Sequence, residues 1–299
     1  MRVDPHYVSG LVASLNSSTL AEQKLTSELS SGLAVSSLSD NPVAAGQASM
    51  LTSTISQDDT FVQTAATAES LMQVADSALG SVVTQLTSAL SLAVEGNSGT
   101  ESASDLTALS QQLGSIRDQV VALANTSYQG TYIFAGSDGD VQPFAVDTST
   151  TPATTTYYGD TQVGSVTTEN GQQIQTGLAG SAVFLAPGAD VMTALNNLVA
   201  DFAGGTVSGT ASTDIGVLQT ALSNVSQQRL SLDSSLNRIQ TASSFTQTDA
   251  TNRTATVSTL VSADPATVAT QLSSAETQNQ ALMSVIATVE KQSLFDMIQ

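Results

Sequence analysis

Apolar residues recur at alternating steps of three and four along most of the chain, a spacing that places side chains on one side of a helix. Three such seams begin at Ala65, Leu106 and Ile215, and the last is interrupted by Arg229. Helices with one apolar stripe are not stable alone, so we predict that these pack into one intramolecular bundle rather than a dimeric coiled coil. The seams comprise Ala65, Ala68, Met72, Ala75, Leu79, Val82, Leu86, Ala89 and Ala93, then Leu106, Leu109, Leu113, Ile116, Val120 and Leu123, then Ile215, Leu218, Leu222, Val225, Leu232, Leu236 and Ile239.

The two ends of the chain carry seams of the same kind. The N-terminal frame contains Val8, Leu11, Leu15, Leu25 and Leu29, with Ser18 and Glu22 as polar members. The C-terminal frame contains Val268, Leu272, Ala275, Leu282, Ile286 and Val289, with Asn279 as the polar exception. A single helix of this length is marginal in water, so we predict that the two terminal helices pair with each other or dock on neighbouring subunits.

Each terminal seam is separated from the centre by a break in the helical pattern. The first break is the stretch LSSGLAVSSLSDNPVAAG, which runs from Leu29 to Gly46. Within it Asn41 is well placed to cap a new helix, and Pro42 suits the first turn, where a missing N–H costs nothing. The second break, SADP at 262–265, has the same order of cap and proline. We therefore predict that both terminal helices are hinged modules.

The helical periodicity changes between about residues 135 and 209, where Thr, Gly and Asp are frequent. Asn170-Gly171 is the strongest kind of signal for a two-residue hairpin turn, with strands at Val163–Thr168 and Gln172–Thr176. The predicted fold class is therefore mainly α with a β-rich insert: a long antiparallel helical bundle made from both ends of the chain, with paired terminal helices and a small β outer domain.

Composition narrows the range of partners. The chain has 299 residues, no Cys or Trp, and 7 Lys plus Arg against 26 Asp plus Glu, for a formal charge of −19. This charge argues against nucleic acid and anionic membrane as partners. Charged residues make up only 11 %, so Ser, Thr, Gln and Asn cover a surface that is cheap to desolvate. Uninterrupted apolar runs such as Ala182–Ala186 are far shorter than the about 18 residues of a membrane span, so we expect no membrane segment.

Residues that could support catalysis or metal binding are scarce. His6 is the only histidine, and no Gly-Lys pair occurs, which leaves no His-based triad and no phosphate-cradling loop. Asp138 and Asp140 could suggest calcium, but the loop lacks its closing Glu, so a solvated turn is the better interpretation. Asp58-Asp59 is interpreted as a polar helical face. We expect no catalytic, cofactor-binding or metal site, and no enzyme activity.

The chain resembles the bacterial flagellin family of axial proteins, most closely the group that joins hook to filament. LSSG and SDNPVAA resemble the family's N-terminal signature through Leu29, Ser30, Ser31, Gly32, Asp40, Pro42 and Ala44. LANTSYQGTYIFAGS, at 123–137, resembles the passage that leads from the bundle to the outer domain, and YYGD and AGSAVF resemble strands of that domain. The C-terminal KQSLFDMI is similar to the family's closing pattern through Ser293, Leu294 and Phe295.

The resemblance implies a domain order and partners. Residues 1–43 with 263–299 would form an inner tube domain, 44–134 with 210–262 the helical bundle, and 135–209 the β-rich outer domain. It implies a secreted structural adaptor at the hook–filament junction, exported by the flagellar type III system and folding on assembly. Its partners would be hook-associated protein 1, flagellin, copies of itself, and an export chaperone on the C-terminal helix. No cofactor is implied.

The site residues expected from this are of two kinds. Connector residues are Leu29, Ser30, Ser31, Gly32, Asp40, Asn41, Pro42, Asp264 and Pro265. Residues of terminal-helix packing are Leu11, Leu15, Leu25, Leu272, Leu282, Ile286, Val289, Leu294 and Phe295.

Other interpretations stay open. A flagellin that forms the filament itself shares the fold, although GTYIFAGS and the ending Phe295–Gln299 favour the junction group. A secreted coiled-coil adhesin or effector would explain the acidity and the β lobe, but not the two matched breaks.

Overall fold

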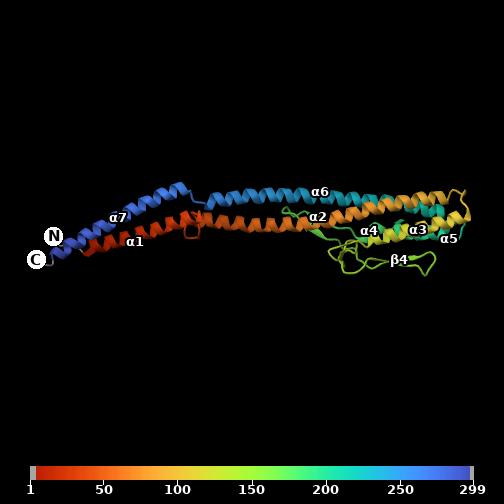
Figure 1. Cartoon of the computed structure of the whole chain (residues 1–299), viewed down its shortest axis with the longest axis horizontal. Helices are drawn as coiled ribbons and strands as arrows, with labels where there is room; N and C mark the ends of the chain where they lie inside the picture. The colour runs from red at the N-terminus through yellow and green to blue at the C-terminus, as the bar shows by residue number, and fades with distance from the viewer. Residues whose placement is uncertain (1–4, 297–299) are drawn as a thin grey trace. The chain divides into compact units, whose positions relative to one another are not determined.

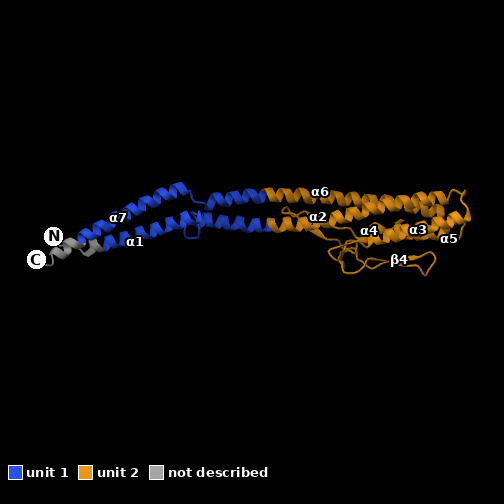
Figure 2. Ribbon diagram, viewed as in Figure 1, with its two compact units in different colours: residues 1–57, 249–299 blue, residues 58–248 orange. Residues whose placement is uncertain are grey.

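The computed structural model describes residues 5–296, and side chains are described from residue 9 to residue 289. The chain divides into two compact units, residues 1–57 with 249–299 and residues 58–248 (Figure 2). The first unit contains α1 (Pro5–Ser31) and α7 (Pro265–Asp296), together with the start of α2 (Pro42–Gly96) and the end of α6 (Ala211–Val261). The predicted three-domain division remains a prediction.

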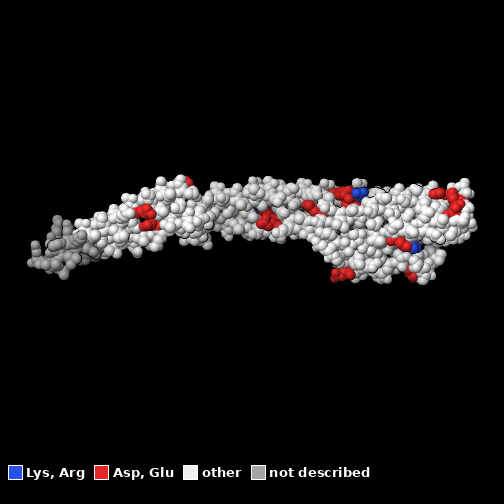
Figure 3. Space-filling view, viewed as in Figure 1, with Lys and Arg blue, Asp and Glu red and all other residues white. Residues whose placement is uncertain are grey.

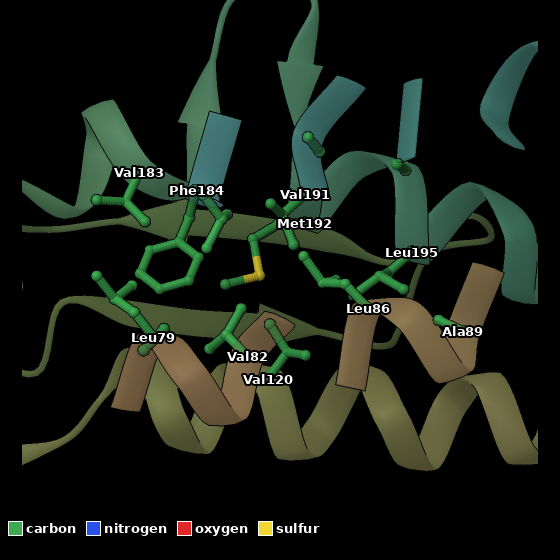
Figure 4. Close-up of a cluster of buried hydrophobic side chains, with 14 of the residues drawn as sticks. Leu79, Val82, Leu86, Ala89, Val120, Val183, Phe184, Val191, Met192 and Leu195 are labelled. Carbon is green, nitrogen blue, oxygen red and sulfur yellow. The ribbon is translucent and has the colours of Figure 1, made fainter. Parts of the chain in front are cut away.

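The second unit contains the hydrophobic core, and the three predicted seams meet in it. The seams lie on α2, α3 (Ala103–Ala124) and α6, whose side chains join one buried cluster. Met72, Leu79 and Leu113 are 0 % exposed. Figure 4 shows Leu79, Val82 and Leu86 facing Met192 and Leu195 across this core. The mainly α fold with a bundle core is therefore confirmed.

Arg229 explains the interruption in the third seam. Its guanidinium lies against the Asp76 carboxylate of α2, with 2.6 Å between Nε and Oδ1 and 3.1 Å between Nη2 and Oδ2. This bidentate pair joins α6 to α2 at a position where an apolar residue would continue the stripe.

The interpretation of Asp58-Asp59 as a polar face is wrong for Asp58. Asp59 is exposed, but Asp58 is only 1 % exposed. The reason is the heptad frame: Asp58 lies seven residues before Ala65, so it falls on the buried seam, whereas Asp59 is turned about 100° away.

The insert contains short antiparallel hairpins, drawn in green in Figure 1. The predicted hairpin is confirmed, because Ser165, Val166 and Thr167 pair with Gln175, Ile174 and Gln173. The prediction of a two-residue turn is wrong. The Thr168 N–H donates to the Gln172 carbonyl, so the loop has three residues, 169–171. Within this loop only Gly171 has a positive φ, of 76°, whereas a type I′ turn needs two such residues. The strands are β1 (Ser127–Tyr128), β2 (Thr131–Tyr132), β3 (Phe144–Asp147), β4 (Thr154–Tyr157), β5 (Ser165–Thr167), β6 (Gln173–Gln175), β7 (Leu185–Ala186) and β8 (Ala189–Asp190).

The region 135–209 is less β-rich than expected, because it also contains two helices. These are α4 (Gly180–Phe184) and α5 (Val191–Ala203). Helix α5 packs along α3, and its Met192, Leu195 and Leu198 are fully buried. Its apolar residues follow helical spacing over 13 residues, which is long enough to indicate a helix. The Thr, Gly and Asp content of the surrounding region masks this local pattern.

Helix α2 is long and apolar enough to span a membrane by length and composition alone. The expectation of no membrane segment considered only uninterrupted apolar runs, which do not reveal this average, and it stays a prediction. Alanine between the seam residues raises the average hydropathy, and serine and threonine lower it far less than charged residues would. The seam itself is packed in the bundle core, as the 0 % exposure of Leu79, Val82 and Leu86 shows.

Candidate functional site: the terminal helices and their connector

Helices α1 and α7 pack against each other along one seam, as the sequence predicts (Figure 1). They run antiparallel, since Asn279 contacts Glu22 while Ala263 contacts Gly32. The predicted seam residues are half-buried on both helices; they are Leu11, Leu15, Leu25, Leu272, Leu282, Ile286 and Val289. Leu294 and Phe295 lie outside the residues whose side chains are described.

A polar layer interrupts this seam. The Asn279 amide donates to Glu22 Oε2 at 2.6 Å, while its own Oδ1 is buried without a hydrogen-bond donor. A single amide within an apolar seam fixes the register of a helix pair, because any slip would leave it unpaired. The polar seam positions found in the sequence, Glu22 and Asn279, are thus partners.

The first unit leaves many apolar side chains in solvent. Its buried apolar residues, within the described part, are Ala44, Ala48 and Val268, and none is fully enclosed. Its exposed large apolar residues are Val12, Leu20, Leu29, Leu33, Leu38, Val43, Met50, Met283 and Val285, from 38 % to 74 % exposed. Few charged atoms break up the visible surface (Figure 3). Exposed apolar side chains on a weakly charged surface cost little to bury against a partner.

The connector between α1 and α2 pairs with the second break, a contact that the sequence does not reveal. Gly32 ends α1 with a φ of 72°, and its carbonyl accepts from the Ala263 N–H at 2.9 Å. The Ala34 N–H donates to the Val261 carbonyl at 2.8 Å, and Leu33 bridges Ser262. The two breaks therefore form a short antiparallel ladder that holds them together.

Asp40 organises the rest of the connector. Its Oδ2 accepts the backbone N–H groups of Ser36 and Ser37 at 3.2 and 3.0 Å, and Lys24 Nζ lies 3.1 Å from its Oδ1. The bond from Lys24, followed by those from Ser37 and Ser36, holds the pKa of the Asp40 carboxyl far below its usual range. Asp40 thus attaches the loop to α1 through an ion pair.

The helices that follow the two breaks begin as predicted. Asn41 Oδ1 accepts the Ala44 N–H at 3.1 Å, and Pro42 is the first residue of α2. At the other break Asp264 accepts from the Ala266 N–H and the Thr267 hydroxyl, and Pro265 begins α7. These bonds, with that from Thr267 the largest cause, lower the pKa of Asp264. The capping role of Asn41 is confirmed.

The remaining predicted connector residues differ in their surroundings. Ser30 and Ser31 are both exposed, and Ser31 Oγ accepts the Leu33 N–H at 3.2 Å. Leu29 is 41 % exposed and stands apart from the half-buried seam of its helix. Sequence reasoning missed Lys24, although it lies on the same side of α1 as Glu28, four residues on, with which it also pairs. The assembly roles of these residues remain predictions.

Comparisons with known proteins agree with the paired ends. Residues 9–138 match the bacterial flagellin N-terminal helical region, and residues 215–298 match the bacterial flagellin C-terminal helical region, which together cover well over half of the chain. Flagellar hook-associated protein 3 of Salmonella typhimurium is 31 % identical over 162 residues, 54 % of this chain and 49 % of that protein. The chain thus aligns with about half the length of this curated relative.

Solved structures show the same fold. Flagellar hook-associated protein 3 of Legionella pneumophila has a TM-score of 0.63 at 13 % identity, covering 71 % of this chain and 98 % of that one. The FlgL protein of Bacillus cereus has a TM-score of 0.56 at 20 % identity, covering 70 % and 97 %.

Substituting Gly32→Ala should destabilise the first unit by about 1 kcal/mol, because a left-handed backbone is strained for any residue with a Cβ. No atom lies within 4 Å of the added Cβ, so backbone strain alone is tested. Urea denaturation followed by circular dichroism measures the effect. Gly46→Ala is the matched control, since Gly46 is helical with equally open space and alanine should stabilise there. A stabilising Gly32→Ala would contradict the assignment.

The connector should loosen in acid. Because the Asp40 pKa is depressed in the folded chain, its contribution is complete above the ordinary carboxyl value of 3.8 and is lost as pH falls through the folded-state pKa. NMR should show the Ser36 and Ser37 amide signals titrating well below pH 3.8. In Asp40→Asn this titration should disappear. Titration of the wild type at the ordinary value would show that the Lys24 and serine contacts do not hold in solution.

Proposed function

The chain belongs to the bacterial flagellin family, and on that basis we propose that it is the structural adaptor that joins the flagellar hook to the flagellin filament. The family consists of structural flagellar proteins rather than a known class of enzyme. The adaptor would act outside the cell, at the hook–filament junction. Its neighbours there would be hook-associated protein 1, flagellin and other copies of the chain.

The observation that carries this proposal is the unfinished burial of the first unit. Leu20 on α1 is 60 % exposed and Met283 on α7 is 61 % exposed, although both helices are already paired. Helices α1 and α7 each cover only one stripe of the other. Apolar side chains outside these stripes therefore have no partner within the unit. Neighbouring subunits would cover them, and each large side chain so buried would contribute about 1.5–3 kcal/mol.

The route to assembly follows from the same helices. A chain without cysteine can pass an export channel unfolded, with no bridge to form or break. Before export, the apolar face of α7 would lie in the groove of a cytoplasmic chaperone, which would keep it from aggregating. After export, α1 and α7 would pair and dock on neighbours, so that folding and assembly are coupled.

A flagellin that forms the filament is the second candidate, because it shares the terminal helices. The curated relatives favour the junction role, since the matched proteins of Salmonella typhimurium and Escherichia coli are both named flagellar hook-associated protein 3. A secreted adhesin or effector would not require two breaks that pair with each other.

Deletion of the gene tests the proposal. Cells should keep their hooks, lack filaments and release soluble flagellin into the medium, as electron microscopy and immunoblotting of the supernatant would show. Cells that lose the filament because its bulk subunit is missing would identify the chain as flagellin instead.

A variant pair makes this test specific to the first unit. Leu20→Asp should leave the monomer folded, because Leu20 is already 60 % exposed, yet fail to restore filaments to the deletion strain. Leu230→Asp is the matched control, a 68 % exposed leucine in the second unit, and should restore them. Full restoration by Leu20→Asp would contradict burial of that stripe on assembly.

A further inference from the structure

The chain carries its most easily oxidised side chains on the exposed surface of the first unit. It has no Cys and no Trp, so the methionine thioethers are the groups that hydroperoxides attack most readily. Met50 on α2 is 74 % exposed and Met283 on α7 is 61 % exposed. Met72 and Met192, in the second unit, are 0 % exposed. Exposure therefore divides the methionines with described side chains into two accessible and two protected ones.

Both accessible methionines lie in uncharged stretches of their helices. The residues three and four positions away are their neighbours on the helix surface. These neighbours are Gly46, Gln47, Ser53 and Thr54 around Met50, and Asn279, Gln280, Ile286 and Ala287 around Met283. None of them is charged, so covering either thioether with a partner removes no charged neighbour from water. The side chain of methionine also adapts readily to an irregular apolar surface.

The two methionines differ in one respect from the other exposed apolar residues of this unit. The other large ones are Val and Leu, which hydroperoxides leave unchanged. A methionine thioether, in contrast, is converted to a polar sulfoxide. Oxidation can therefore change the polarity of this surface at Met50 and Met283 without changing the sequence.

We propose that Met50 and Met283 are modification sites at which a hydroperoxide blocks assembly of the first unit. This inference rests on the adaptor function proposed above, in which neighbouring subunits cover the exposed apolar residues of the unit. A hydroperoxide would reach both thioethers in the unassembled chain. After assembly the neighbours would shield them.

The modification transfers one oxygen atom. A lone pair on methionine Sδ attacks one oxygen of the hydroperoxide, the O–O bond breaks, and the other oxygen leaves as water or as an alcohol. The thioether loses two electrons and becomes a sulfoxide, and the hydroperoxide gains them. With hydrogen peroxide the products are one sulfoxide and one water for each methionine.

The sulfoxide should affect assembly far more than folding. Its oxygen accepts hydrogen bonds, and in the monomer water can supply them, because both side chains are mostly exposed. Against an apolar surface of a neighbour the same oxygen has no donor. Burying a polar group without a hydrogen bond is unfavourable, so the oxidised chain should fold but assemble poorly.

Co-assembly with flagellin onto isolated hooks of the deletion strain tests the proposal. The purified chain is treated with hydrogen peroxide, the peroxide is removed with catalase, and filaments are counted by electron microscopy. Peptide mass spectrometry should show Met50 and Met283 oxidised well before Met72 and Met192. The treated chain should start at least about fivefold fewer filaments than the untreated chain, with an unchanged circular dichroism spectrum. Reduction by the two methionine sulfoxide reductases, one for each epimer, should restore the count.

A double variant makes the test specific to the two sites. Met50→Leu combined with Met283→Leu keeps apolar side chains of similar volume, and it should assemble equally well before and after peroxide. Met72→Leu, which replaces a buried thioether, is the control and should stay sensitive. Inhibition that persists in the double variant would overturn the proposal, as would a wild type that assembles normally once both sites are oxidised. Failure of the adaptor function would look different, because the untreated chain would then start no filaments either, and this proposal would fall with it.

Discussion

Two helices that lie side by side can bury only one stripe of each, and this limit determines the burial in the first unit. In the second unit the helices α2, α3, α5 and α6 surround one core, and side chains such as Leu79, Leu113 and Leu195 reach 0 % exposure. In the first unit α1 and α7 have only each other along their seam, so Leu15 and Leu282 are half-buried. The difference follows from the number of helices around each seam, and the polar members Ser18, Glu22 and Asn279 of the terminal seams add to it.

The connector holds the starts of the two terminal helices' pairing in place. The ladder between Gly32–Ala34 and Val261–Ala263 joins the two breaks, so the two terminal helices leave the bundle together and in register. Asn279 and Glu22 fix that register further along the pair. The structure thus specifies how α1 and α7 meet, while the apolar residues on their outer faces remain available to neighbours.

The sequence predicts helices better than it predicts contacts between distant segments. The seams of α2, α3 and α6, and the cap at Asn41, follow from local spacing and hydrogen-bonding chemistry, and the structure confirms them. The pairing of Gly32 with Ala263 and of Lys24 with Asp40 joins segments whose proximity depends on the whole fold. Helix α5 has a clear local pattern of 13 residues, but it lies inside a region whose overall Thr, Gly and Asp content favours strands and turns. The burial of Asp58 follows from its heptad position, although its polarity favours a solvent-exposed face.

The central claim is that the terminal helices are completed only by neighbours, and hydrogen exchange by mass spectrometry tests it most directly. In dilute monomer, peptides from α1 and α7 should exchange much faster than those from α3 and α5. After co-assembly with flagellin onto isolated hooks, the same terminal peptides should become as protected as the core. Equal protection of both regions in the dilute monomer, with no further gain on assembly, would contradict the account.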